Sequence, residues 1–271
     1  MLWIGSGLAV IFIMLLFFAW MRVEATGCKV SRDIVSSSSI PEAFEGVNIL
    51  LLTDIHRRKL TEKKLGPLLQ EADYVFLGGD ITEKGVPLKR LEHNLLLLTK
   101  NTPTFAVLGN HDLKAGASQV KAILDQTGAR LLNDETIFLN RGRSSIALTG
   151  YMQPQTRFHP YSRFTGRASK HDFHIVLVHD PIWIQGRKKL PTDLILTGHT
   201  HGGQIVLPVL GAVKLEGFYK KYGSGWYDLP RSRWRNEPVK LLISRGFGTS
   251  HIPLRYRCPA ELHMITLKKT P

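Results

Sequence analysis

The stretch VNILLLTDIH at residues 47–56 decides the fold, because a short apolar run ends there in two side chains that bind metals well. Val47–Thr53 has the length and the apolar composition of an inner strand. Asp54 and His56 follow two residues apart, so both side chains can reach one ion where the backbone turns. This stretch therefore predicts a strand with a metal site at its carboxyl end.

The same pattern, an apolar run that ends in polar side chains, recurs four more times. The runs are Tyr74–Leu77, Thr104–Leu108, His174–Val178 and Leu194–Thr197. The polar side chains that follow them are Asp80, Asn110, His111, Asp112, His179, Asp180, His199 and His201. Carboxyl ends of parallel strands share one edge of a sheet, so five separate segments are expected to meet there. Imidazole, carboxylate and one amide suit Mn, Fe, Zn or Co rather than Ca.

Helix-like patterns separate the early runs and predict an α/β domain. Pro87–Lys100 has leucines at spacings of three and four, and Val120–Leu124 indicates a second helix. Ile146–Thr149, Val239–Ser244 and Leu262–Leu267 look like further strands. The alternation predicts a largely parallel inner sheet that later strands close.

The first 21 residues predict a transmembrane anchor. Residues 1–21 contain no charged side chain, and about 20 apolar residues are needed to cross a bilayer as a helix. Trp3 and Trp20 stand where interfacial aromatic side chains would lie. A cleavable signal peptide is the alternative, but its apolar run is usually shorter and follows a basic segment.

Three basic residues, Arg22, Lys29 and Arg32, follow the apolar run. By the positive-inside tendency, a single-pass protein of the cell membrane with its large domain in the cytoplasm is expected. Residues 22–45 form either a linker or a first edge strand, and residues 46–271 form the main domain.

Composition agrees with a globular protein that meets anions. The chain has 271 residues, 43% of them hydrophobic, which is enough apolar surface to exclude disorder. Its 36 Lys and Arg outnumber 22 Asp and Glu, so the net charge is +14. This charge attracts phosphorylated substrates, nucleic acid or anionic lipid. Two distant cysteines, Cys28 and Cys258, make a thiolate metal site unexpected.

The five blocks D-x-H, G-D, G-N-H-D, H and G-H-x-H, in this order, resemble the signature of the calcineurin-like metallophosphoesterases. The resemblance implies a two-sheet β-sandwich flanked by helices and two divalent metal ions, Mn, Fe or Zn. His111 would lie beside the phosphate and act on the transition state or the leaving oxygen, with Asp112 orienting its ring. The implied ligands are Asp54, His56, Asp80 and His201 for one ion, and Asp80, Asn110, His179 and His199 for the other.

The second half of the chain resembles a narrower, bacterial membrane-associated branch that includes UDP-2,3-diacylglucosamine pyrophosphatases. The segments that carry this resemblance are Gly198–Gln204, Leu207 with Pro208, Ser244–Ser250, Pro253 and Arg255. Departures lie at Arg57–Lys59, at His251 and at Leu229–Glu237, where substrates are expected to be chosen. Tyr151–Lys170 is expected to be a long, functional loop. The choice among monoester, diester and pyrophosphate therefore stays open.

Two functions from different classes follow. The first is a hydrolase that cleaves a phosphodiester or pyrophosphate of a lipid or lipid-linked nucleotide at the membrane. The alternative is a non-catalytic, metal-stabilised module that holds nucleic acid or anionic lipid on its basic face. A complete ligand set favours the enzyme, and a membrane anchor makes nucleic acid the less expected partner. The remaining histidines are expected to be packed or solvated: His93, His159, His171, His174, His251 and His263.

Overall fold

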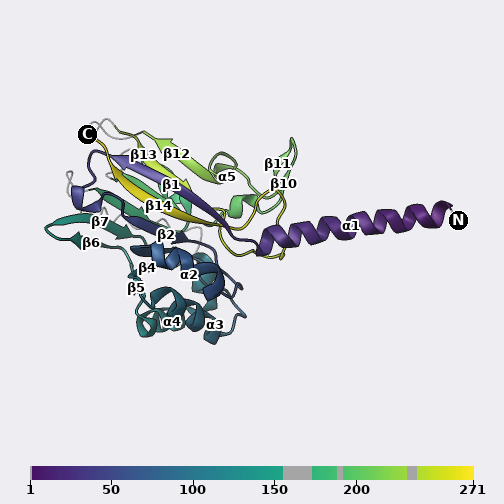
Figure 1. Cartoon of the computed structure of the whole chain (residues 1–271), viewed down its shortest axis with the longest axis horizontal. Coiled ribbons are helices and arrows are strands. Elements are labelled where there is room, and N and C mark those ends of the chain that lie inside the picture. The colour runs from purple at the N-terminus through teal and green to yellow at the C-terminus, as the bar shows by residue number, and fades with distance from the viewer. Residues whose placement is uncertain (1, 155–172, 188–191, 231–236) are drawn as a thin grey trace.

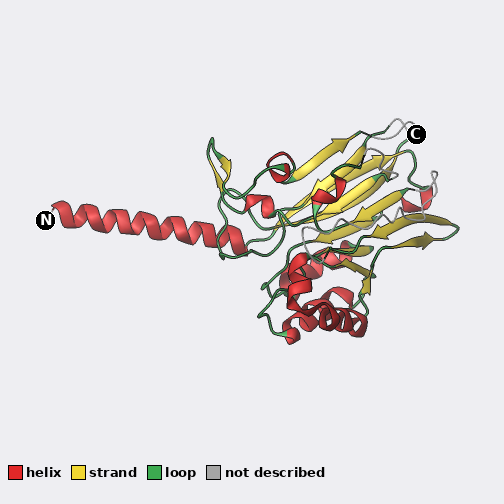
Figure 2. Ribbon diagram, turned by 180° about the vertical axis from the view of Figure 1, so that it is seen from behind, coloured by secondary structure: helices red, strands yellow, loops and turns green. Residues whose placement is uncertain are grey.

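The structure, a computed structural model, describes residues 2–154, 173–187, 192–230 and 237–271. Within these residues, two six-stranded sheets pack face to face, and helices cover the outer face of the first sheet (Figure 1). A long helix, α1 (Leu2–Thr26), projects away from this domain (Figure 2). The predicted α/β fold, a two-sheet β-sandwich flanked by helices and preceded by an apolar helix, is confirmed.

The first sheet carries the strand that begins the metal-binding pattern. Its strands are β1 (Lys29–Ser37), β2 (Asn48–Leu52), β3 (Tyr74–Gly78), β4 (Thr104–Val107), β5 (Arg130–Leu131) and β14 (Glu261–Lys269). They lie in the order β1-β14-β2-β3-β4-β5. The strands from β2 to β5 are parallel, so their carboxyl ends reach the same edge. β14 runs antiparallel to β2 and parallel to β1.

The second sheet brings the later histidines to the site. Its strands are β6 (Glu135–Arg141), β7 (Ser144–Gly150), β8 (His174–Leu177), β9 (Leu194–Thr197), β12 (Gly225–Leu229) and β13 (Val239–Ile243). They lie in the order β12-β13-β9-β8-β7-β6, with four parallel strands between two antiparallel edges. The strands β10 (Val206–Leu207) and β11 (Gly211–Ala212) form a separate antiparallel hairpin.

Both faces of β2 are buried, as its unbroken apolar run requires. Ile49 and Leu51 belong to the core between the sheets, whereas Leu50 and Leu52 face the core beneath the helices. The helices of this layer are α2 (Glu62–Glu71), α3 (Leu88–Thr99) and α4 (Asn110–Thr127). Short helices complete the chain: η1 (Glu42–Phe44), η2 (Pro181–Ile184), η3 (His201–Gly203) and α5 (Phe218–Lys221). The two helices predicted from leucine and valine spacing correspond to α3 and α4.

The N-terminal helix is almost free of the domain. Only 6% of its most apolar window is buried, and the helix continues past residue 21 to Thr26. Met21 and Ala25 are buried at its last turns, where the helix meets the domain. β1 then forms the edge of the first sheet, within the stretch that the sequence left as linker or strand. Most of the predicted Tyr151–Lys170 loop lies outside the described residues.

Candidate metal centre and active site

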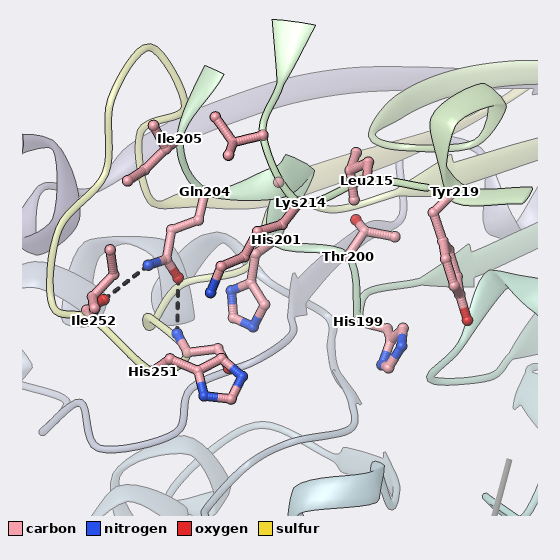
Figure 3. A pocket seen from close by; sticks show the side chains of 13 residues that line it. His199, Thr200, His201, Gln204, Ile205, Lys214, Leu215, Tyr219, His251 and Ile252 are labelled. Carbon is pink, nitrogen blue, oxygen red and sulfur yellow. Dashed lines mark hydrogen bonds between the residues drawn. The ribbon is translucent and has the colours of Figure 1, made fainter. Parts of the chain in front are cut away.

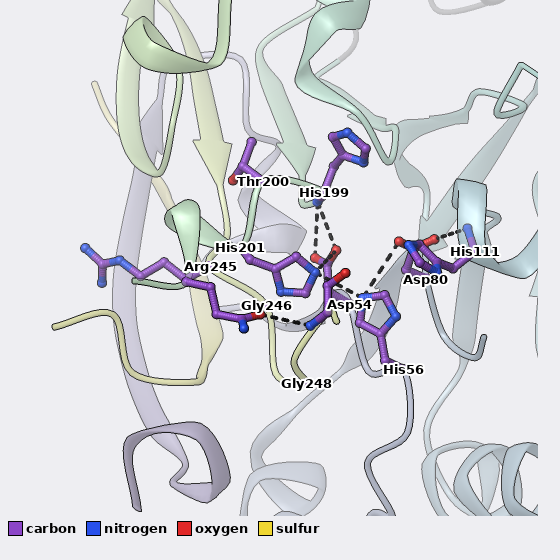
Figure 4. Close-up of polar contacts among 12 residues, drawn as sticks. Asp54, His56, Asp80, His111, His199, Thr200, His201, Arg245, Gly246 and Gly248 are labelled. Atoms are coloured by element: carbon purple, nitrogen blue, oxygen red, sulfur yellow. Dashed lines mark hydrogen bonds and ion pairs between the residues drawn. The ribbon is translucent and has the colours of Figure 1, made fainter. Parts of the chain in front are cut away.

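Seven predicted ligand side chains come from five strand ends of both sheets, and the structure brings six of them into two adjoining clusters (Figure 4). In the first cluster, the Nε2 atoms of His56 and His201 lie 3.0 Å apart, and Asp54 Oδ1 lies 3.5 Å from His201 Nε2. Each cluster contains three ligand atoms that all lie within 4.8 Å of one another. The members are Asp54, His56 and His201 in the first cluster, and Asp80, His179 and His199 in the second.

Asp80, a member of the second cluster, also lies close to the first. Its Oδ2 atom is 3.8 Å from His56 Nε2 and 3.3 Å from His179 Nε2. His199 completes the second cluster, with Nδ1 3.2 Å from His179 Nε2. This is the position that a bridging carboxylate requires, but the binding of ions by these residues stays a prediction.

The backbone at five of these positions adopts a conformation that side chains rarely tolerate. Asp54, His56, Asp80, His199 and His201 all have φ between 50° and 73°. Non-glycine residues with positive φ are uncommon, and such strained positions gather at functional sites where surrounding structure holds them. The sharp turns direct these five side chains inward from the strand ends. The backbone strain at these five residues therefore indicates a functional site, where bound ions would offset the energy that the strain costs.

Two glycines allow the strand ends to approach closely. A Cβ atom at Gly109 would collide with the Asp80 carboxylate, and one at Gly198 would collide with that of Asp54. The close approach of these strand ends therefore depends on glycine, which has no Cβ atom.

The donor atoms fit divalent cations. Asn110 Oδ1 is buried and has no hydrogen-bond partner among the described residues, which is unusual for a buried amide oxygen unless an ion or water satisfies it. His179 Nδ1 donates to the carbonyl oxygen of Gly78 at 2.9 Å, and this leaves Nε2 free to face the centre. The His199 backbone N–H donates to both oxygens of Asp54, at 3.1 and 3.2 Å. These contacts fix the orientation of the ligands before any ion arrives.

Burial and neighbouring charges set the protonation of the centre. Burial opposes ionisation of Asp80, yet the charge and hydrogen bond of His179 lower its pKa overall. Burial, with the nearby charges of His56 and Arg255, keeps the pKa of His201 well below its usual value. His201 is therefore neutral at pH 7, which is the state that a metal ligand needs.

His111 and Asp112 stand at the start of α4. The His111 backbone N–H donates to Asp80 Oδ1 at 2.7 Å, and its half-buried ring lies 4.9 Å from the His56 ring. Both Asp112 oxygens accept backbone N–H groups, from Thr82 at 2.9 Å and Gly109 at 2.8 Å. Burial, followed by the charge of Asp80, raises the pKa of Asp112 to about 7. The described contacts of Asp112 tie two loops together, and its orienting role toward His111 stays a prediction.

Two carboxylates near the centre were not assigned from the sequence. Glu83 Oε2 lies 3.0 Å from His56 Nδ1, and the same carboxylate pairs with Arg57. Asp180 Oδ2 lies 3.5 Å from His199 Nε2 and accepts a hydrogen bond from Tyr219 Oη at 2.9 Å. Carboxylates behind metal-binding imidazoles orient the rings and raise their basicity. The only sequence signal was that each carboxylate closely follows a metal-binding block.

The two arginines of Arg57–Lys59 lie in different surroundings, and a role of this segment in substrate choice stays a prediction. Arg57 lines a pocket beside the centre. Arg58 turns the other way, stacks 3.5 Å above the Phe247 ring and donates to the carbonyl oxygens of Phe247 and Thr26. Burial lowers its pKa to about 10. These contacts hold the end of α1 against the domain. They also occupy the Arg58 guanidinium with partners inside the protein.

Arg255 is a fully buried cross-link behind the first cluster. Its guanidinium donates to the carbonyl oxygens of Arg245, Gly246 and Gly248 at 2.7, 3.1 and 2.7 Å. Its Nη2 atom lies 3.3 Å from His201 Nδ1. The resemblance included this arginine without a role, and the structure shows that it fixes the loop that packs on Asp54.

Arg255→Met is expected to lower the free energy of unfolding by about 3 kcal/mol, because several buried carbonyl oxygens lose their donor while the apolar volume is kept. Urea titration in detergent, followed by tryptophan fluorescence, measures this loss. Arg143→Met, at an exposed arginine, is the matched control and should change stability by less than about 0.5 kcal/mol. Equal stability of the two variants would contradict the cross-linking role.

Two pockets flank the centre. The first, of about 280 Å³, extends from His199 and His201 to Val213, Leu215 and Ile252 (Figure 3). The second, of about 710 Å³, lies beside His111 and is lined by basic side chains that include Arg57, Lys84 and Lys114. One pocket thus offers apolar contacts and the other offers positive charge.

His251 is exposed, as expected of a solvated histidine, and it also lies beside the centre. It lines both pockets, and its ring lies 6.4 Å from that of His111. His174 and His263 are buried with polar partners, as expected of packed histidines, and His93 is exposed. His159 and His171 lie outside the described residues.

Comparison with known proteins agrees with this geometry. The family model described as Calcineurin-like phosphoesterase matches residues 47–203. "Uncharacterized protein YpbG" of Bacillus subtilis is 29% identical, over 82% of this chain and 81% of that protein. "Uncharacterized metallophosphoesterase YkuE" of the same organism is 28% identical, over 89% of this chain and 86% of that protein. "Phosphodiesterase YaeI" of Escherichia coli is 27% identical, over 81% of both chains.

The family match covers more than half of the chain and includes every block of the metal-binding pattern from Asp54 to His201. The sandwich fold and the two adjoining clusters of ligand atoms agree with it. This chain belongs to the calcineurin-like phosphoesterase family and is a metal-dependent phosphoester hydrolase.

Proposed function

We propose that the chain hydrolyses a phosphodiester or pyrophosphate of a lipid or lipid-linked nucleotide at the membrane surface. The observation that carries the proposal is the position of the centre between an apolar pocket and a basic pocket. A substrate with one apolar and one anionic end fits this arrangement. The resemblance to UDP-2,3-diacylglucosamine pyrophosphatases names a substrate of that kind.

The residues of the chain divide the work. When bound, two divalent ions such as Mn, Fe or Zn supply an activated water and stabilise charge on phosphoryl oxygens. The proposed ligands are Asp54, His56, Asp80, Asn110, His179, His199 and His201. His111 faces the side of the basic pocket, where it can donate a proton to a leaving oxygen. Lys84 and Lys114 are exposed along that pocket and suit a second phosphate.

We further propose that residues 1–21 anchor the chain in the cell membrane. The helical window Ser6–Thr26 has a mean hydropathy of 2.1 and is long enough to span a bilayer, although a signal sequence passes the same test. The Met21 carbonyl oxygen accepts from the Arg255 N–H at 3.1 Å, and Glu24 Oε2 accepts from the Cys258 N–H at 3.2 Å. Cleavage after the apolar run would remove contacts that the folded domain uses. The basic residues that follow favour a cytoplasmic domain.

The test uses the full chain in lipid nanodiscs with Mn²⁺ and a panel of nucleotides, nucleoside diphosphate sugars and phospholipids. Turnover that EDTA abolishes is expected, with the highest kcat/KM on a lipid-linked diester or pyrophosphate. Lys84→Met with Lys114→Met is expected to raise KM for a pyrophosphate about tenfold, since each lost charge contact contributes modestly. Lys121→Met, exposed elsewhere on α4, is the control. Salt-sensitive nucleic-acid binding without hydrolysis would favour the non-catalytic alternative instead.

A further inference from the structure

The β10–β11 hairpin carries an apolar tip that the protein itself does not cover. Val209 is 105% exposed and Leu210 is 81% exposed, and Val213 just beyond β11 is 58% exposed. Single exposed apolar residues are ordinary, but adjacent ones at the end of a projecting hairpin mark a contact with an apolar partner. The tip contains no charged side chain, since Leu207–Ala212 has the sequence LPVLGA.

The base of this hairpin is joined to the end of α1. The Val206 N–H donates to the Tyr256 carbonyl oxygen at 3.0 Å, and the Tyr256 N–H donates to the Gln204 carbonyl oxygen at 3.0 Å. The Tyr256 ring packs edge-on against Phe17 and Trp20 of α1, with centroids 5.2 and 5.3 Å apart. Both views place the hairpin at the end of the domain from which α1 leaves, while the β6–β7 hairpin lies at the opposite end (Figure 1, Figure 2).

Basic and aromatic side chains near the hairpin suit the surface of a bilayer. Lys214 is the second residue after β11, and Arg22 and Arg257 are close in sequence to the aromatic side chains that contact each other at the end of α1. All three basic residues are exposed. Tryptophan and tyrosine gather at membrane interfaces, and each nearby cation is attracted to anionic headgroups. An apolar tip with basic residues near its foot, beside a helix long enough to span a membrane, matches the layers of a lipid leaflet.

We propose that the tip of the β10–β11 hairpin, Pro208–Leu210, inserts into the bilayer beside α1 as a second membrane contact. This inference rests on the proposed anchoring by α1. Val213 and Lys214, at the foot of the hairpin, also line the pocket that reaches His199 and His201. The inserted hairpin therefore opens the apolar pocket toward the headgroup layer, and an acylated substrate can enter while its chains stay in the membrane.

Site-directed spin labelling of the full chain in vesicles with anionic lipid tests this insertion. Val209→Cys and Leu210→Cys each receive a nitroxide, and Arg143→Cys, in the exposed turn between β6 and β7, is the matched control. The unsubstituted chain, in which Cys258 is buried and Cys28 half-buried, reports background labelling. The ratio of collisions with oxygen to collisions with a water-soluble nickel chelate measures depth. This ratio is expected to be at least tenfold higher at 209 and 210 than at 143.

Three results would overturn the inference. Equal chelate access at 209 and 143, in chains that float with the vesicles, would reject insertion while leaving the anchor and the hydrolase intact. Spin–spin broadening at 209 that disappears on dilution with unlabelled chains would show that a second copy covers the tip. Chains that fail to float with vesicles would remove the anchor and the insertion together. Turnover of a soluble diester, measured in parallel, shows whether the proposed hydrolase activity is present whatever the outcome for insertion.

Discussion

Asp80→Ala is expected to lower turnover by roughly 10³-fold or more and to remove bound metal, because an ion acting as Lewis acid supplies several kcal/mol to the transition state. The Asp80 carboxylate lies 3.8 Å from His56 Nε2 and 3.3 Å from His179 Nε2, so its loss affects both clusters. Metal content per chain by mass spectrometry and turnover of a chromogenic phosphodiester measure the two effects.

The controls for this prediction separate metal binding from folding. Asp80→Asn keeps an oxygen that can accept the His111 N–H, so it should fold normally and still lose metal and activity. Asp125→Ala, at an exposed carboxylate on α4, should change neither quantity. Full metal content together with normal turnover in Asp80→Ala would remove the bridging role.

His111→Ala is expected to leave the metal content unchanged and to lower kcat by about 10²- to 10⁴-fold, the usual contribution of a positioned general acid. The retention of metal follows because the contact with Asp80 uses the His111 backbone N–H and survives the substitution. The loss of kcat follows because the imidazole faces the pocket where a leaving group would depart.

The choice of leaving group distinguishes two roles for His111. If the ring donates a proton, the loss should be large for a phosphodiester of a poor alkoxide leaving group and small for p-nitrophenyl esters. If the ring only stabilises phosphoryl charge, the two losses should be equal. His93→Ala, exposed on α3, is the control. Normal kcat of His111→Ala on both substrates would exclude both roles.

The α/β character and the candidate ligands could be predicted because both depend on local patterns, whereas the two-sheet sandwich came from the resemblance to a known family. Ile49–Leu52 is a short, unbroken apolar run, which is typical of a central strand buried on both faces. Asp54 and His56 follow it directly, so knowing that the strand ends at a common edge is enough to place them. The same reasoning placed His199 and His201 after β9.

Elements with weak local signals were missed. Helix α2 was not predicted, because EKKLGPLLQE contains Gly66 and Pro67, which disfavour helix in isolation. Packing of Leu65 and Leu68 against the first sheet outweighs that cost. The short strand β12 has mixed polarity and forms because it pairs with β13.

Contacts between distant segments could not be derived from one sequence. Glu83 meets His56 because β2 and β3 pair in the first sheet, and Arg255 meets Arg245–Gly248 where the chain passes from the second sheet to the first. Arg58 resembled its basic neighbours in sequence, yet its partners Phe247 and Thr26 lie far away along the chain. The role of such residues depends on topology, whereas a metal-binding block carries its chemistry in adjacent positions.

The hydrogen bond from Arg58 to the carbonyl oxygen of Thr26 fastens the end of α1 to the domain. If α1 anchors the chain as proposed, this contact keeps the candidate site near the surface of the bilayer. The proposed lipid-linked substrate would then reach the site by lateral diffusion within one leaflet, so its encounter rate would follow its density per unit area rather than its concentration in solution.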